Sequence, residues 1–121
     1  MKKIKTLKKN YEFKNVLNKG KFYIGNQIII YIIQNEENAN RIGIAISSKT
    51  CNAVKRNSIK RKIRENYRLI SGNLKQGYQI AFLWNKKIPV ENADFNIIKK
   101  DMEFIFVKAG ILKWRTYLFF Y

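Results

Sequence analysis

The chain has 121 residues, with 25 Lys and Arg, 8 Asp and Glu and no His, which gives a net charge of +17 at pH 7. This length suits one compact domain, and a hydrophobic content of 46% excludes a disordered basic tail, because such a chain can bury enough surface to offset its ordering entropy. The missing His removes the commonest general base and metal ligand. The charge indicates a polyanionic partner, either nucleic acid or an anionic membrane surface.

Neither the carboxylates nor the single thiol predicts a catalytic or metal site. The acidic residues are scattered, and Cys51 alone can form neither a disulfide nor a Cys-rich zinc site. We therefore expect no catalytic residue and no metal ligand on the protein. The longest aliphatic and aromatic run, Ile28 to Ile33, is far shorter than a membrane span of about 20 residues. The Lys-rich start lacks the apolar stretch of a signal peptide, so we expect a soluble, unexported, cytoplasmic protein.

The first element in the chain is predicted to be a short helix. Asn10 is a good N-cap, and Phe13, Val16 and Leu17 follow at helical spacing. Gly20 fits the position just past the end of that helix.

Two strands are predicted next. The Ile-rich run from Ile24 to Ile33 is typical of one strand that is covered on both faces. After a turn over residues 35–40, the segment from Arg41 to Ser47 alternates, with Ile residues toward the core and the small residues Gly43 and Ala45 on the other face. The small face favours close packing of a neighbouring element, and backbone approach to a ligand is the alternative.

The second half predicts a long helix from Ala53 to Ile70, a buried strand from Tyr78 to Trp84, and a last helix that Asp94 caps and Gly110 stops. The order α-β-β(-β)-α-β-α, with room for a third early strand, predicts an α+β fold: a small mixed sheet with helices packed on it. Residues 1–110 are expected to form the single domain. The aromatic C-terminal tail, residues 111–121, is expected to dock on it, and a partner-binding or lipid-facing tail is the alternative.

The long helix carries the most informative segment, KRNSIKRKIRENYR over residues 55–68. At about 100° per residue, the apolar residues Ile59, Ile63 and Tyr67 form one stripe and the basic residues fill an adjoining sector. Cations at i and i+4 repel one another, and Glu65 is the only acid within reach. A polyanion would neutralise this repulsion, so we predict a phosphate-binding face rather than a merely solvated one. Its residues are Arg56, Asn57, Lys60, Arg61, Arg64 and Arg68.

From Arg41 to Arg68 the chain reads RIGIAISSKTCNAVKRNSIKRKIRENYR and resembles the bacterial ribonuclease P protein component. The shared pattern is a glycine-containing strand, Ser and Lys, an Asn-Ala-Val entry, and a helix with Arg-Asn, Lys-Arg and Arg. Two positions depart from it: Cys51 stands where the family favours Gly, and Ser58 where it favours Arg or Lys. For Cys51 a small buried apolar residue is favoured over a reactive thiol. Outside the block, the fitting residues are Leu7, Lys8, Phe13, Val16 and Gly20.

The resemblance implies a left-handed β-α-β crossover through the basic helix, an exception to the usual handedness. It also implies a ribonucleoprotein subunit that promotes removal of the 5′ leader from precursor tRNA, with the catalytic groups and the Mg²⁺ ions mainly on a catalytic RNA. The implied partners are that RNA and precursor tRNA, with no DNA and no membrane.

The resemblance further implies a cleft between the first helix and the sheet that receives the single-stranded leader. Its residues would be Phe13, Leu17, Ile29 and Tyr31, with Lys49 and Lys60 near its mouth. From the apolar pattern alone, Phe13 and Tyr31 also fit core positions. Two other functions remain open from the residues: a structural RNA-binding protein such as a ribosomal protein or RNA chaperone, and a membrane-active cationic protein.

Overall fold

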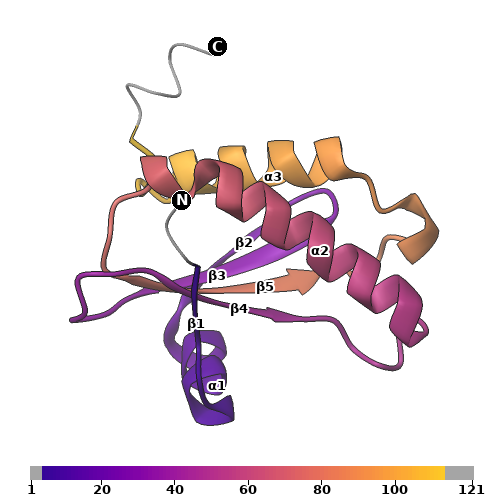
Figure 1. The fold of residues 1–121 in the computed structure, drawn as a ribbon, viewed down its shortest axis with the longest axis horizontal. Helices are drawn as coiled ribbons and strands as arrows, with labels where there is room; N and C mark the ends of the chain where they lie inside the picture. The colour runs from indigo at the N-terminus through magenta and orange to yellow at the C-terminus, as the bar shows by residue number, and fades with distance from the viewer. Residues whose placement is uncertain (1–3, 114–121) are drawn as a thin grey trace.

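The computed structural model describes residues 4–113, which form a five-stranded mixed sheet with helices on both faces. Helices α2 and α3 cover one face and α1 lies on the other (Figure 1). The strand order is β1-β4-β5-β3-β2; β4 is parallel to both β1 and β5, and β3 is antiparallel to both β5 and β2. This arrangement confirms the predicted α+β fold. The elements are β1 (Lys5–Thr6), α1 (Asn10–Lys19), β2 (Lys21–Ile24), β3 (Ile28–Gln34), β4 (Arg41–Ala45), α2 (Ala53–Ile70), η1 (Ser71–Asn73), β5 (Tyr78–Trp84), η2 (Val90–Asn92) and α3 (Phe95–Lys108).

The core lies between the sheet and the helix pair α2 and α3. Alternate residues of β3 point into it, so Ile28, Ile30 and Ile32 are buried while the residues between them are half-buried. Phe82 of β5 is fully buried, with its ring at 5.9 Å from Tyr67 of α2 and 6.3 Å from Phe106 of α3. These edge-to-face contacts join both helices to the sheet.

The single strand predicted from Ile24 to Ile33 is wrong, because the chain turns after Ile24 and forms the hairpin of β2 and β3. The cause is Asp101, a buried residue of α3 whose carboxylate accepts hydrogen bonds from three consecutive backbone N–H groups at the turn, Asn26, Gln27 and Ile28, at 2.9, 2.7 and 3.2 Å. Asp101 is about 75 positions away in the sequence, so its contact cannot be predicted locally. Gly25-Asn26 is a local turn signal that the prediction of one strand did not take into account.

The N-terminal segment adds β1, a strand that the sequence pattern did not predict. The two residues of β1 pair with Arg41 and Ile42 of β4. From β4 the chain passes through α2 into β5, which is parallel to β4 and beside it, so α2 is the connection of a β-α-β unit. Its predicted left-handedness stays a prediction.

The end of α3 agrees with the predicted stop at Gly110, which follows the helix with φ of +78°, a conformation that glycine adopts without strain. Ile111 and Leu112 are buried against the core. Residues 114–121, most of the predicted aromatic tail, lie outside the described residues. Within residues 4–113, no helix combines the length and apolarity needed to cross a membrane.

Candidate nucleic-acid interface

Helix α2 presents its basic residues away from the core. Asn52 caps its N-terminus, because the side-chain oxygen accepts a hydrogen bond of 2.9 Å from the backbone N–H of Lys55. The apolar stripe is buried, with Ile59, Ile63 and Tyr67 at 1%, 0% and 3% exposure. Of the six predicted phosphate-binding residues on the helix, Arg56 and Lys60 are half-buried, and Asn57, Arg61, Arg64 and Arg68 are exposed.

Three of these cations, Lys60, Arg61 and Arg64, form no ion pair within the described part of the chain. Arg68 differs, since its Nη1 lies 3.0 Å from Oε1 of Glu65. The Nη1 of Arg56 donates a hydrogen bond of 2.7 Å to a carbonyl in the turn before the helix, so part of its guanidinium supports that turn. The uncompensated charge is therefore concentrated in the middle of α2.

The structure accommodates both departures from the family pattern, Cys51 in the turn before α2 and Ser58 within the helix. Cys51 is half-buried and packs against the core, and no non-glycine residue among those described has a positive φ, so a side chain at this position is not strained. The Ser58 hydroxyl accepts a hydrogen bond of 2.7 Å from the Nζ of Lys62. Lys49 is exposed in the turn between β4 and α2.

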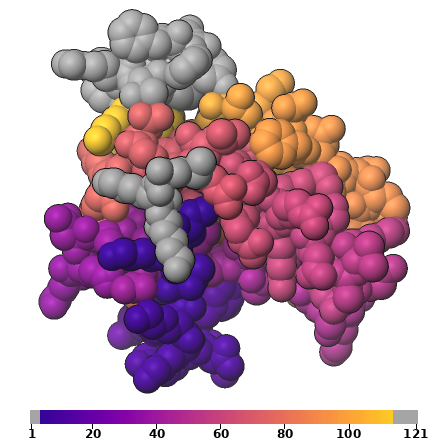
Figure 2. All heavy atoms as spheres, in the orientation of Figure 1, coloured from indigo at the N-terminus to yellow at the C-terminus, as the bar shows by residue number. Residues whose placement is uncertain are grey.

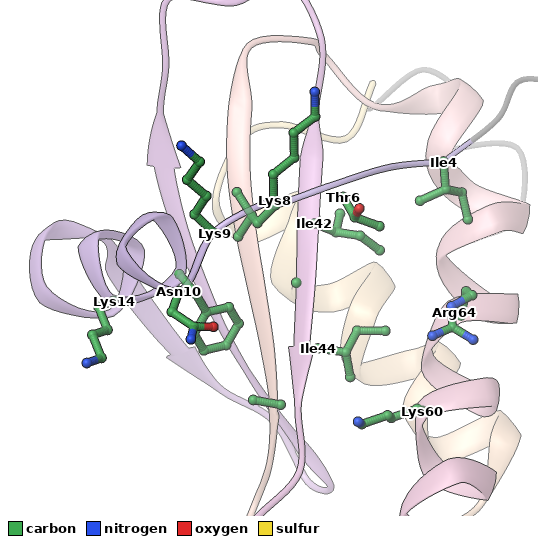
Figure 3. Close-up of a pocket in the computed structure, with 14 residues that line it drawn as sticks. Ile4, Thr6, Lys8, Lys9, Asn10, Lys14, Ile42, Ile44, Lys60 and Arg64 are labelled. Atoms are coloured by element: carbon green, nitrogen blue, oxygen red, sulfur yellow. The ribbon is translucent and has the colours of Figure 1, made fainter.

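A pocket of about 430 Å³ lies between the N-terminal segment, α1, β4 and α2. Lys60 and Arg64 reach toward it from α2 and lie opposite β4 (Figure 3). Phe13 of α1 also lines it, so the structure brings these three predicted residues together. The other predicted cleft residues, Leu17, Ile29 and Tyr31, and also Lys49, do not line this pocket.

The sequence interpretation did not place the N-terminal lysines in this pocket. Lys8, Lys9 and Lys14 line it together with the α2 cations (Figure 3). In the space-filling view, α1 forms an indigo lobe that stands apart from the magenta surface of α2 and the turn before it (Figure 2). The signal available in the sequence was the lysine-rich start, but only the pairing of β1 with β4 shows where it lies.

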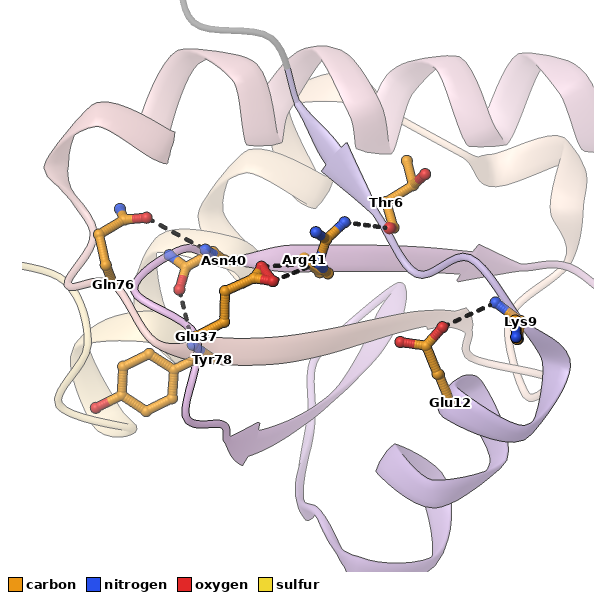
Figure 4. A network of polar contacts seen from close by, with 8 residues as sticks. All are labelled: Thr6, Lys9, Glu12, Glu37, Asn40, Arg41, Gln76 and Tyr78. Atoms are coloured by element: carbon orange, nitrogen blue, oxygen red, sulfur yellow. Dashed lines mark hydrogen bonds and ion pairs between the residues drawn. The ribbon is translucent and has the colours of Figure 1, made fainter.

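Hydrogen bonds fix the N-terminal segment over β4 (Figure 4). Arg41 of β4 donates from Nη1 to the carbonyl of Thr6 at 3.2 Å, and its Nε lies 2.8 Å from the Glu37 carboxylate. Glu12 accepts a hydrogen bond of 3.1 Å from the backbone N–H of Lys9 at the start of α1. Lys9 is therefore the N-cap of this helix, and the prediction of Asn10 as the cap is wrong by one residue. The N-terminal segment, which forms one wall of the pocket, is thus held in place by Arg41 and Glu12, two residues that do not line the pocket.

The small residues on one face of β4 leave room for the ring of Phe13, as the surroundings of Gly43 show. A Cβ at Gly43 would lie 2.6 Å from Cδ2 of Phe13, which is closer than carbon atoms approach in packed proteins. The face therefore admits an aromatic ring of α1, which confirms close packing of a neighbouring element. The ring is half-buried, so part of it is open to the pocket.

The remaining predicted cleft residues lie on the same face of the sheet as α1. Ile29 and Tyr31 alternate with the buried residues of β3, so they point away from the core and are half-buried. Leu17 of α1 is half-buried as well. The register aligns two rows across this face, Gly43–Ala81–Tyr31–Phe22 and Ala45–Leu83–Ile29–Ile24.

Two titratable groups near α2 have shifted pKa values. Burial raises the pKa of Tyr67 to about 12, and a hydrogen bond with Asn40 opposes this shift. A hydrogen bond from its own backbone and then the neighbouring Lys55 ammonium lower the pKa of the exposed Glu91 carboxyl. Both groups therefore keep one charge state around neutral pH.

Comparison with known proteins supports the resemblance seen in the sequence. The ribonuclease P family model matches residues 1–110. The chain is 34% identical over 113 residues to the ribonuclease P protein component of Clostridium perfringens, covering 88% of this chain and 89% of that protein. It is 37% identical over 109 residues to that of Caldanaerobacter subterraneus subsp. tengcongensis, covering 90% and 92%.

The fold agrees with this relationship. The Staphylococcus aureus RNase P protein matches with a TM-score of 0.78 and 30% sequence identity, over 91% of this chain and 99% of that one. The family model, the relatives and the solved structure therefore agree over most of the chain, and the chain belongs to the bacterial ribonuclease P protein components.

Proposed function

We propose that α2 binds the catalytic RNA of ribonuclease P through its basic face, and that the pocket and the adjoining sheet face receive the unpaired 5′ leader of precursor tRNA. Family membership makes the chain the protein subunit of an RNA-based endoribonuclease that matures tRNA. The observation that carries the assignment of residues is the position of Lys60 and Arg64. Both lie on α2 without an ion pair among the described residues, and both line the pocket beside Phe13.

The chemistry of this surface suits single-stranded RNA. Unpaired bases stack on aromatic rings, and the rings of Phe13 and Tyr31 are each partly open on the α1 side of the sheet. Ammonium and guanidinium groups neutralise the phosphates that connect the bases, and Lys8, Lys60 and Arg64 are placed to do so around the pocket.

The proposal assigns Mg²⁺ and the bond-breaking groups to the RNA. Mg²⁺ prefers carboxylate and phosphate oxygens. The carboxylates on or beside α2 are engaged by cations, Glu65 by Arg68 and Glu91 by Lys55, and residues 4–113 contain no cluster of three or more candidate metal ligands. In this proposal the protein side chains bind and position RNA.

The first experiment measures binding of the protein to its cognate ribonuclease P RNA as a function of salt. Arg61→Ala and Arg64→Ala should each lower the slope of log K against log salt by up to about 0.7 to 0.9, the value for one lost phosphate contact. Lys99→Ala is the matched control, because Lys99 is an exposed cation of α3. Slopes that are unchanged in both Arg variants would place the RNA elsewhere.

The second experiment tests the leader site in the reconstituted holoenzyme. Phe13→Ala and Tyr31→Ala should weaken binding of leader-bearing precursor tRNA and leave binding of mature tRNA unchanged. Equal losses for both ligands would contradict the leader site. Such a result would favour a structural RNA-binding role.

A further inference from the structure

Strand β2 places two large apolar side chains in solvent at the outer edge of the sheet. Phe22 is 57% exposed and Ile24 is 65% exposed. Because β2 pairs with β3 in the register Phe22 to Tyr31 and Ile24 to Ile29, both side chains share the face on which Tyr31 and Ile29 lie. This is the face that carries α1, opposite α2 and α3 (Figure 1).

The rings of Phe22 and Tyr31 form a pair. Their centroids are 5.7 Å apart and their planes are tilted by 34°. This contact fixes one side of the Phe22 ring, while more than half of the side chain stays open to solvent. An exposed ring that is held by another ring is a preorganised stacking surface, since little side-chain freedom is lost when a base binds.

Phe22 and Tyr31 belong to the row of aligned residues that ends at Gly43, beneath the ring of Phe13. Tyr31 lies opposite Ala81, and Ala81 lies opposite Gly43, over which the Phe13 ring packs. From β4 to β2 this row crosses three strand spacings, about 14 Å at the usual separation of paired strands. Ala81 in the middle of the row is fully buried on the face that carries α1, so a bound strand of RNA has to pass around α1 and needs more than one nucleotide to reach Phe22.

We propose that Phe22 is a further leader-binding residue, on which an unpaired leader base stacks at the β2 edge, beyond the nucleotides held at Phe13 and Tyr31. This inference rests on the leader site proposed above and extends it to the full width of the sheet. The exposed Lys19 lies at the end of α1, next to the short connection to β2, where it can neutralise a phosphate of the same strand.

The test compares Phe22→Ala with Phe104→Ala in the reconstituted holoenzyme. Phe104 is the matched control, because it is 62% exposed on α3, on the other side of the sheet. Three ligands are used: precursor tRNA with a long leader, precursor with a single-nucleotide leader, and mature tRNA. Phe22→Ala should weaken binding of the long-leader precursor by about tenfold, in the range found for loss of one stacked base, and leave the other two unchanged.

Phe22→Trp should retain long-leader affinity, because indole also offers a flat face. The role of Phe22 would be overturned if Phe22→Ala weakened binding of all three ligands equally. It would also be overturned if Phe22→Ala had no effect while Phe13→Ala and Tyr31→Ala still weakened binding of the precursor; in that case the leader site would stand. If none of the three variants separates precursor from mature tRNA, the leader site itself is wrong. Phe22→Ala should also leave the sedimentation of the free protein unchanged; loss of a dimer with intact leader affinity would make the β2 edge a protein interface instead.

Discussion

Adding one methyl group at Gly43 tests whether the Phe13 ring is fitted to β4. The new Cβ would lie 2.6 and 2.9 Å from two ring carbons of Phe13 and 3.1 Å from Cδ1 of Leu7. Carbon contacts settle at about 3.5 to 4.0 Å, so the ring must move by roughly 1 Å. Overpacking of this kind costs about 1 to 3 kcal/mol, and the lower backbone entropy of Ala in the unfolded chain returns about 0.5 to 1 kcal/mol. Gly43→Ala should therefore lower the free energy of unfolding by about 1 kcal/mol.

The decisive measurement is a double-mutant cycle by urea unfolding. In a Phe13→Ala background the ring is gone, so Gly43→Ala should become neutral or slightly stabilising, which gives a coupling energy of about 1 to 3 kcal/mol. Gly72→Ala is the matched control, because a Cβ there meets no atom within 4 Å and should not couple to Phe13. If Gly43→Ala is equally destabilising with and without the ring, the strand backbone requires the glycine and the fitted ring is refuted.

Two buried polar groups give further predictions. Asp101→Asn should lower the free energy of unfolding by about 3 kcal/mol, because a neutral amide cannot replace a carboxylate that accepts three backbone hydrogen bonds; an unchanged urea midpoint would contradict this role. The raised pKa of Tyr67, about 12, means that the folded state holds this proton more tightly than the unfolded state. Stability should therefore be complete below about pH 10 and fall by about 2 kcal/mol as pH rises to 12, while Tyr67→Phe should lack this decline; parallel curves would refute it.

Local patterns predicted the elements whose signals lie within a few residues of one another. Helix α2 carries a stripe of apolar residues at helical spacing, and the structure has it from Ala53 to Ile70 as expected. The alternation in β4 and the Asp94 cap of α3 are local in the same way. In each case the stabilising contact joins residues close in sequence, or the period itself shows which face is buried.

The hairpin of β2 and β3 shows what local patterns miss. The stretch from Ile24 to Ile33 is apolar except for Gly25, Asn26 and Gln27, and the distant carboxylate of Asp101 holds the turn that these residues make. Because the sequence predicted the third early strand only as an option and without bounds, the pairing of Phe22 with Tyr31 was invisible. The same holds for the pocket, where lysines of the N-terminal segment meet Lys60 only because β1 pairs with β4. Site residues from one element were predictable, but contacts between elements were not.

The charge on α2 can be weighed against the packing that holds the helix. Three pairs of cations at i and i+4 lie between Arg56 and Arg68, and each costs about 0.2 to 0.5 kcal/mol, so their sum is about 1 kcal/mol. Burial of Ile59, Ile63 and Tyr67 contributes about 1.5 to 3 kcal/mol for each side chain. Packing therefore outweighs repulsion severalfold, so the repulsion between the cations does not by itself prevent α2 from forming without RNA. Because the basic face is preformed, RNA binding relieves the repulsion between its cations and imposes no ordering cost on α2. The binding free energy that is not spent on ordering the helix can then position the substrate.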